Sequence, residues 1–105
     1  MMTNYGYAII KMLYNDQGLV EKELYYDTEE CPVKSRYDGY GICRGYDDKE
    51  RNTIIIHVDE YGNPMIAGNG YAKIYRSFYE DGYSAGKVRE EFYFDELDQP
   101  VTCLL

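Results

Sequence analysis

The residues best suited to catalysis or metal binding are a single histidine, His57, and three cysteines, Cys31, Cys43 and Cys103. A zinc site needs such ligands at a regular spacing, and a cysteine nucleophile needs a histidine beside it. Neither pattern occurs, no C-x-x-C pair is present, and three thiols leave one unpaired in any disulfide scheme. We therefore expect no catalytic residue, no cofactor and no metal site, and free thiols that are typical of a reducing compartment.

Adjacent carboxylates offer a second kind of chemistry. Glycosidases place two carboxyl groups across a substrate and raise the pKa of one of them by burial. Most of the acidic pairs here lie in segments of turn composition, where water keeps both groups charged, and no loop has the D-x-[DN]-x-[DN]-G spacing of a calcium site. The sequence therefore predicts solvated turn charge and a protein that is not an enzyme. The pairs are Glu29-Glu30, Asp47-Asp48, Asp59-Glu60, Glu80-Asp81, Glu90-Glu91 and Asp95-Glu96.

An internal repeat accounts for the histidine and for several of the aspartates. Three places share a Gly-Tyr dipeptide, and three others share an Asp, four intervening residues and a Pro. His57 stands where the other copies have Tyr25 and Tyr93, so we interpret it as the replacement of a surface aromatic residue. The chain, residues 1–105, is expected to be one domain of three units, 4–36, 37–67 and 68–105. The repeated motifs are Gly6-Tyr7, Gly39-Tyr40, Gly70-Tyr71, Asp27 to Pro32, Asp59 to Pro64 and Asp95 to Pro100.

Each unit is expected to contain two strands, because its apolar residues recur at every second position. Residues 20–26 alternate so that Val20, Leu24 and Tyr26 share one face, and residues 53–58 repeat the pattern with Ile54, Ile56 and Val58. We expect this face to be buried and the opposite face to be at least partly wet. A helix over residues 13–26 is the competing interpretation, which the interrupting glycine and the β-branched equivalent segment disfavour.

Three hairpins in series predict an all-β fold, an antiparallel meander that forms one twisted sheet or an open barrel. The segments between the strands are rich in Asp, Asn and Gly, which is typical of turns. The Asp of each Asp-to-Pro loop is expected to accept the backbone N–H two residues later, and the Pro to end the strand pairing. Such a meander leaves an exposed strand at each end, so we expect a homodimer through edge strands.

The best copy of the motif, Asp59-Glu60-Tyr61-Gly62-Asn63-Pro64 followed by Gly68-Asn69-Gly70-Tyr71-Ala72, resembles the tyrosine-rich YD-like hairpin repeats of Firmicutes proteins. The resemblance extends from Gly6 to Val101. It implies tandem β-hairpins that mediate interactions, in a family whose activities are mostly unknown. The copies are degenerate, since Glu30 and Asp98 replace the glycine of the second turn in units one and three.

Tyrosine is the most distinctive part of the composition, with 14 Tyr against 3 Phe and no Trp. A tyrosine ring supplies apolar contact area while its hydroxyl stays hydrogen-bonded, so it suits a partly wet sheet face and protein interfaces. We therefore expect a non-catalytic protein-binding or assembly module that uses a tyrosine-rich face. The expected partner-binding residues are Tyr7, Tyr25, Tyr40, Tyr71, Tyr75 and Tyr93.

The net charge of −8 disfavours direct binding of nucleic acid and favours a protein partner with a basic surface. One alternative is a small acidic inhibitor, of the kind that phages use, which imitates nucleic acid and blocks a basic nucleic-acid enzyme. Another is a cell-wall glycan ligand for the aromatic residues. No apolar run is long enough to span a membrane and residues 1–11 lack a signal-peptide pattern, so the expected location is cytoplasmic, with a fragment of a surface protein as the alternative.

Overall fold

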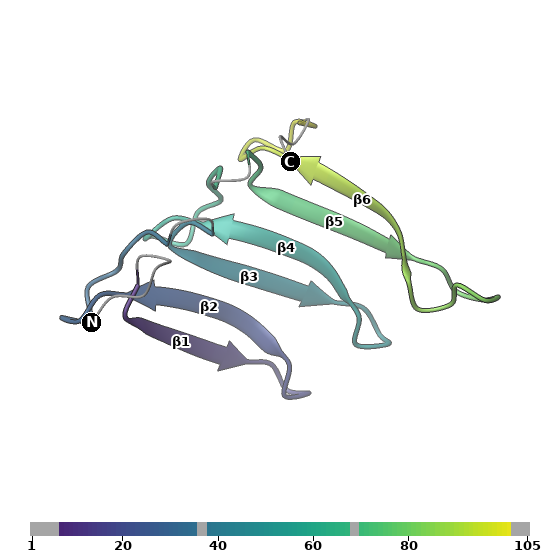
Figure 1. Cartoon of the computed structure of the whole chain (residues 1–105), viewed down its shortest axis with the longest axis horizontal. Coiled ribbons are helices and arrows are strands. Elements are labelled where there is room, and N and C mark those ends of the chain that lie inside the picture. Colours follow the sequence, from purple (N-terminus) through teal and green to yellow (C-terminus); the bar gives the residue numbers. More distant parts are fainter. Residues whose placement is uncertain (1–6, 36–37, 68–69, 102–105) are drawn as a thin grey trace.

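The computed structural model describes residues 7–35, 38–67 and 70–101, and they form a six-stranded antiparallel sheet in the order β1-β2-β3-β4-β5-β6. Each strand pairs with its neighbour in the chain, and the sheet runs as an open meander from β1 at one edge to β6 at the other (Figure 1). The expected all-β meander is confirmed, as one twisted sheet and not a closed barrel. The strands are β1 (Ile9–Tyr14), β2 (Val20–Tyr26), β3 (Gly41–Tyr46), β4 (Asn52–Val58), β5 (Lys73–Phe78) and β6 (Val88–Phe94).

The register of the strands repeats from one hairpin to the next. Within a hairpin six residues of each strand are paired, as from Ile9 opposite Tyr26 to Tyr14 opposite Val20, with one irregularity before the turn. Between hairpins the pairing is shorter and covers three residues of each strand, as where Leu24 faces Gly41. The three hairpins are therefore the stronger units, and two shorter junctions join them into a sheet.

A side-chain oxygen organises most of the turns. In the loop after β2, Oδ1 of Asp27 accepts the backbone N–H groups of Glu29 and Cys31, and Glu30 has a left-handed backbone with φ of 62°. This is a type I turn followed by a left-handed residue, which closes a hairpin without splaying its strands. Asp59 and Asp95 accept the equivalent pairs of N–H groups, so the turn role expected for these aspartates is confirmed.

After each Asp turn the chain comes back along the strand that it has just left. The prolines Pro32, Pro64 and Pro100 form isolated bridges with Tyr26, Val58 and Phe94, and the residue after each proline donates its N–H to the strand. Val33 donates to the carbonyl oxygen of Tyr25, for example. The second turn of each unit is thus a short extra hairpin, and its pairing extends one residue beyond the proline that was expected to end it.

The alignment of the three Gly-Tyr dipeptides is wrong by one residue in the second unit. Tyr40 donates its N–H to the carbonyl oxygen of Val58, as Ala8 does to Tyr26 and Ala72 does to Phe94. Gly39, and not Tyr40, therefore corresponds to Tyr7 and Tyr71. The reason is space, because a Cβ atom on Gly39 would approach the Val58 carbonyl oxygen and the Met65 sulfur at 3.0 Å.

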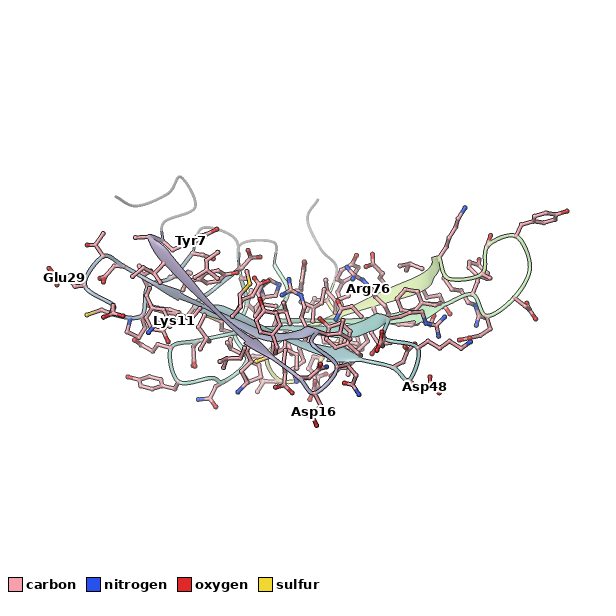
Figure 2. All side chains as sticks on the ribbon, turned by 90° about the horizontal axis from the view of Figure 1, so that it is seen from below. Tyr7, Lys11, Asp16, Glu29, Asp48 and Arg76 are labelled. Carbon is pink, nitrogen blue, oxygen red and sulfur yellow. The ribbon has the colours of Figure 1, made fainter. Side chains whose placement is uncertain are left out.

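The described residues form a single layer. Side chains project from both sides of one thin sheet, and no second sheet or helix covers either side within the described ranges (Figure 2). The radius of gyration is 14.9 Å, whereas a compact chain of this length has about 13 Å. No large side chain of the described part is fully buried, so stability rests on hairpin pairing and partial burial more than on a thick core.

Replacing Asp59 by Ala should lower the free energy of unfolding by about 1 to 2 kcal/mol, because two backbone N–H groups lose their shared acceptor. Asp59→Asn should be nearly neutral, since Asn15 makes the same pair of hydrogen bonds in the turn between β1 and β2. Urea unfolding followed by circular dichroism measures both variants. Equal destabilisation by Ala and Asn would contradict the assigned role of the side-chain oxygen.

Candidate protein-binding surface

The register divides the side chains of the sheet between two faces, because residues directly opposite each other on neighbouring strands point to the same side. One side is mainly apolar, although Lys11, Lys22, Lys73, Ser77 and Glu90 also lie on it in this register, and it is called the apolar face below. The other side alternates charged, aromatic and aliphatic residues and is called the mixed face. The apolar face contains Leu24, Tyr26, Cys43, Ile54, Ile56, Val58, Tyr75, Phe92 and Phe94, and the mixed face contains Glu23, Tyr25, Ile42, Arg44, Ile55, His57, Ile74, Arg76, Glu91 and Tyr93.

The mixed face holds the most deeply buried aromatic residues, contrary to the sequence-based expectation. Tyr25 is 3% exposed, His57 2% and Tyr71 9%. The Tyr7 ring stacks on Tyr25 with 4.9 Å between the ring centroids, and the Tyr71 ring lies edge-on to His57 at 5.2 Å. The expectation that Tyr25, Tyr71 and His57 lie on a wet surface is therefore wrong, because the segments that enter β1 and β5 fold over this face and cover them.

The six tyrosines expected to bind a partner do not form one surface. Tyr7 and Tyr25 make one stack, and Tyr71 packs against Tyr93 with 5.1 Å between the ring centroids. The half-buried Tyr75 points to the apolar face and lies edge-on to Phe94 at 5.2 Å. Tyr40, also half-buried, lines a groove on the apolar face.

Ion pairs occupy the part of the mixed face that lies toward the turns at residues 15–19, 47–51 and 79–87. Glu23 on β2 pairs with Arg44 on β3 across the junction of two hairpins, and Arg76 on β5 pairs with Glu91 on β6. Glu80 joins the second junction by accepting hydrogen bonds from Lys49 at 2.8 Å and Arg51 at 2.9 Å. These two cations hold the pKa of Glu80 below its ordinary value. Ion pairs at a protein surface add little to the free energy of unfolding. We therefore infer that the main effect of these pairs is to favour this order of neighbouring strands.

His57 is buried without the partners that a catalytic histidine needs. Its Nδ1 atom has no hydrogen-bond partner and lies 3.9 Å from Asp38 Oδ1. Burial lowers the pKa of His57, and the nearby Asp38 offsets part of this effect. Cys43 lies on the opposite face of the sheet, where burial raises the pKa of its thiol. A buried neutral histidine and an unactivated thiol on different faces do not make a nucleophilic pair.

Metal ligands do not come together either. Among residues 7–35, 38–67 and 70–101, no group of three or more His, Cys, Asp or Glu side chains could hold a metal ion. Cys31 is exposed, and Cys103 lies outside the described residues. Within the same ranges no helix is long and apolar enough to cross a membrane.

The apolar face carries the residues that the sequence pattern assigned to a buried core. Val58 is deeply buried, but Leu24, Ile54, Ile56 and Tyr75 are only half-buried. At the β6 edge Phe92 is 48% exposed. The prediction that Leu24 and Tyr26 share an apolar face is correct, whereas the register shift before the turn places Val20 opposite Tyr14 and out of that alternation. The expected burial of this face is wrong, because the described part of the chain supplies no layer to cover it.

A groove crosses the apolar face where the first two hairpins meet. Its floor is formed by Leu24, Tyr26 and Val58, and Pro32, Tyr40 and the turn at residues 59–62 contribute to its walls. The volume is about 260 Å³, below the roughly 300 to 1,000 Å³ of pockets that enclose small molecules. The groove is better suited to one or two side chains of a partner protein than to an enclosed ligand.

Acidic turns border the sheet at the end where β2, β4 and β6 finish. Figure 1 shows the arrowheads of these three strands along the same margin. The carboxylates of the turns after them are Asp27, Glu29, Glu30, Asp59, Glu60, Asp95, Glu96 and Asp98. Lys11 pairs with Glu30, and Lys73 with Asp98, but this margin stays strongly negative. A basic partner would be attracted to it.

Sequence reasoning missed Tyr26, Phe92 and Phe94 as candidate binding residues. Their signal was present in the alternation of the strands, but apolar residues on an alternating strand indicate a face and not whether that face is covered. Comparison of the chain with protein-family models, with curated proteins and with solved structures gives no match. The function is therefore inferred from the geometry of this surface.

Unfolding should become easier as the pH falls from about 7 to about 5, because the unfolded chain binds a proton on His57 that the folded sheet excludes. The folded pKa is lowered, so this loss begins near the ordinary value of 6.5. His57→Tyr, which installs the residue of the other two units, should remove the slope in this range. Urea titrations at several pH values test this, and an unchanged slope in the variant would contradict it.

Proposed function

We propose that the chain is a non-catalytic protein-binding module that docks through its apolar face on a protein whose own apolar surface is bordered by basic residues. The observation that carries this proposal is a mainly apolar sheet face without a second layer in the described part of the chain. Sheets normally bury such a face against another element. A partner protein provides that cover here.

The size and composition of the face fit a protein interface. The molecule measures 49 by 32 Å in its two longer dimensions, which exceeds the roughly 800 Å² that each partner contributes to a standard interface. Tyr26 on the first hairpin and Tyr75, Phe92 and Phe94 on the third place aromatic rings toward both edges of the face. Aromatic residues dominate binding energy when a partner excludes water from them. The groove beside Tyr40 gives the partner a position for an anchoring side chain.

The charge of the molecule indicates the kind of partner. The acidic margin adjoins the apolar face, so basic residues around the partner's apolar patch would be attracted during approach. The expected partner with a basic surface is thus retained, while the contact residues differ from the tyrosines expected from the sequence. Tyr25 and Tyr71 support the sheet from the mixed face.

The acidic inhibitor is the second candidate, and the acidic margin is the observation that favours it. An imitation of nucleic acid would bind through carboxylates alone, would weaken steeply with salt, and would be displaced by DNA. Docking through the apolar face would survive moderate salt, because its main contribution is burial of apolar surface. Salt dependence and DNA competition therefore separate the two candidates.

Substituting both Ile54 and Ile56 by Thr should weaken partner capture at least tenfold, because two half-buried apolar side chains of the docking face become polar. Threonine keeps the β-branched shape, so β4 should still pair. The matched control is Ile55→Thr, on the same strand but on the mixed face. Wild type and variants are used as bait in a lysate of the source cell, and captured proteins are compared by mass spectrometry.

A photo-crosslinking residue placed at position 54 or 55 supplies a direct readout. The partner should crosslink from position 54 and not from position 55. Capture that is equal for the Ile54/Ile56 double variant and the Ile55 control, or crosslinking only from position 55, would overturn the proposal.

A further inference from the structure

The two outer strands repeat the backbone pattern that joins neighbouring hairpins inside the sheet. At the first junction Leu24 faces Gly41, and the N–H of Tyr25 donates to the Tyr40 carbonyl oxygen. At the second junction Ile56 faces Lys73, and the N–H of His57 donates to Ala72. Equivalent positions recur at Phe92 and Tyr93 of β6, at Ile9 of β1 and at Ala8, which precedes β1. These strands lie at opposite edges of the sheet (Figure 1).

We propose that β6 of one copy pairs with β1 of a second copy of this chain, in the register of the internal junctions. Phe92 then faces Ile9 of the second copy, Glu91 faces Ile10, and Glu90 faces Lys11. The N–H of Tyr93 donates to the carbonyl oxygen of Ala8 in the second copy. The contact is formed along the edges of β1 and β6, where Lys11, Glu90 and Phe92 lie at the margins of the apolar face. It does not involve Ile54 and Ile56 on the inner strand β4, so its failure can be distinguished from failure of the proposed partner-binding function.

The charges on the two edges are complementary in this register. Glu90 and Lys11 are opposed directly, and opposite charges at such a cross-strand position stabilise pairing. A second pair follows from the internal junction at which Arg51 bonds to Glu80 at 2.9 Å. The N–H of Asp47 donates to the carbonyl oxygen of Arg51, and the N–H of Tyr79 donates to that of Lys87. Arg51 in the second hairpin and Lys87 in the third therefore hold equivalent positions. Asp16 is the second residue of the first hairpin turn, and Glu80 is the second residue of the third. By analogy with the Arg51–Glu80 pair, Asp16 then faces Lys87 of the neighbouring copy.

Tyr14 supplies a third contact. Its counterpart Tyr46 donates its hydroxyl to the carbonyl oxygen of Val20 at 2.6 Å, across the first junction. At the second junction the Arg51 guanidinium lies 4.9 Å from the centre of the Phe78 ring, which also corresponds to Tyr14. Tyr14 is 58% exposed in the isolated chain. Between copies its hydroxyl meets the Val88 carbonyl oxygen and its ring meets Lys87.

Exposed apolar residues on both edge strands also support the proposed pairing of β6 with β1. Met12, Leu13 and Tyr14 of β1 are exposed, as are Val88 and Phe92 of β6, whereas the equivalent residues of the inner strands are half-buried. The contact joins two different edges, so it does not close as a two-fold dimer and extends to rings or filaments. The edge-strand homodimer expected from the sequence becomes a head-to-tail assembly.

Charge exchange tests this register. Glu90→Lys alone places two lysines opposite each other, and Lys11→Glu alone places two glutamates opposite each other, so each variant should self-associate about tenfold more weakly than wild type. A mixture of the two variants restores a Glu-Lys pair at every contact and should associate as wild type does. Sedimentation velocity at low salt over a range of concentrations measures the mass distribution.

Circular dichroism checks that each variant keeps the sheet, and Lys87→Glu with Asp16→Lys provides a second exchangeable pair should either first variant fail to fold. The expected wild-type result is a mass that rises with concentration beyond a dimer. A monomer at every concentration overturns the proposal. So does a dimer that persists in Glu90→Lys alone, which would indicate symmetric pairing of β1 with β1, and so does a mixture no more associated than its components.

Discussion

A side-chain oxygen at the first position organises each five-residue turn of the sheet, and the turns at Asn15 and Asp47 join the strands of the first two hairpins. Asn15, Asp27, Asp47, Asp59 and Asp95 each accept the backbone N–H groups two and four residues later. Turn geometry determines which residues of a hairpin face each other, and a slip of one residue would move every side chain to the other face. The separation into an apolar and a mixed face therefore depends on these turns.

The same turns limit how much of the chain can be buried. A meander of hairpins joined by short loops stays in one layer, and among the described residues parts of the connecting segments cover the mixed face. Tyr7 and Tyr71 provide this cover by packing on Tyr25 and on His57. Burial and the charges of Asp38 and Glu23 raise the pKa of the Tyr25 hydroxyl, so the ring stays neutral in its place. The tyrosines thus act as a small local core, and the apolar face has no covering layer within residues 7–35, 38–67 and 70–101.

The strands and turns were predictable because both follow local rules. Alternation identified β2, β4 and β6, and the spacing from Asp to Pro located the turns, including those in which Glu30 and Asp98 adopt a left-handed backbone. The placement of the connecting segments was not predictable, since residues 33–40 and 65–72 have no periodic pattern. The shifted alignment at Gly39 has the same origin, because it depends on the distance to Val58 and Met65 in space.

The candidate surface was predictable only in part, for a related physical reason. Alternation shows that Ile54 and Ile56 share a face, but whether that face meets solvent depends on an element elsewhere in the chain or in another protein. Tyrosine content suggested a binding role for rings such as Tyr25 and Tyr93, while the structure has Tyr25 at the base of a stack. Composition thus identified tyrosine as the residue type that packs on the sheet. Only the register showed on which face each tyrosine lies.

Side chains at the junctions determine which edges join, because the backbone pattern alone would accept many partners. The two internal junctions share one register but differ in their polar contacts, Glu23 with Arg44 in the first and Arg51 with Glu80 in the second. Exposed edges carry opposite charges at matching positions, Lys11 on β1 and Glu90 on β6. Pairing two β1 edges would bring lysines together, and pairing two β6 edges would bring together the acidic residues of that strand. In the proposed assembly, charge at a few positions gives each strand edge a preferred neighbour.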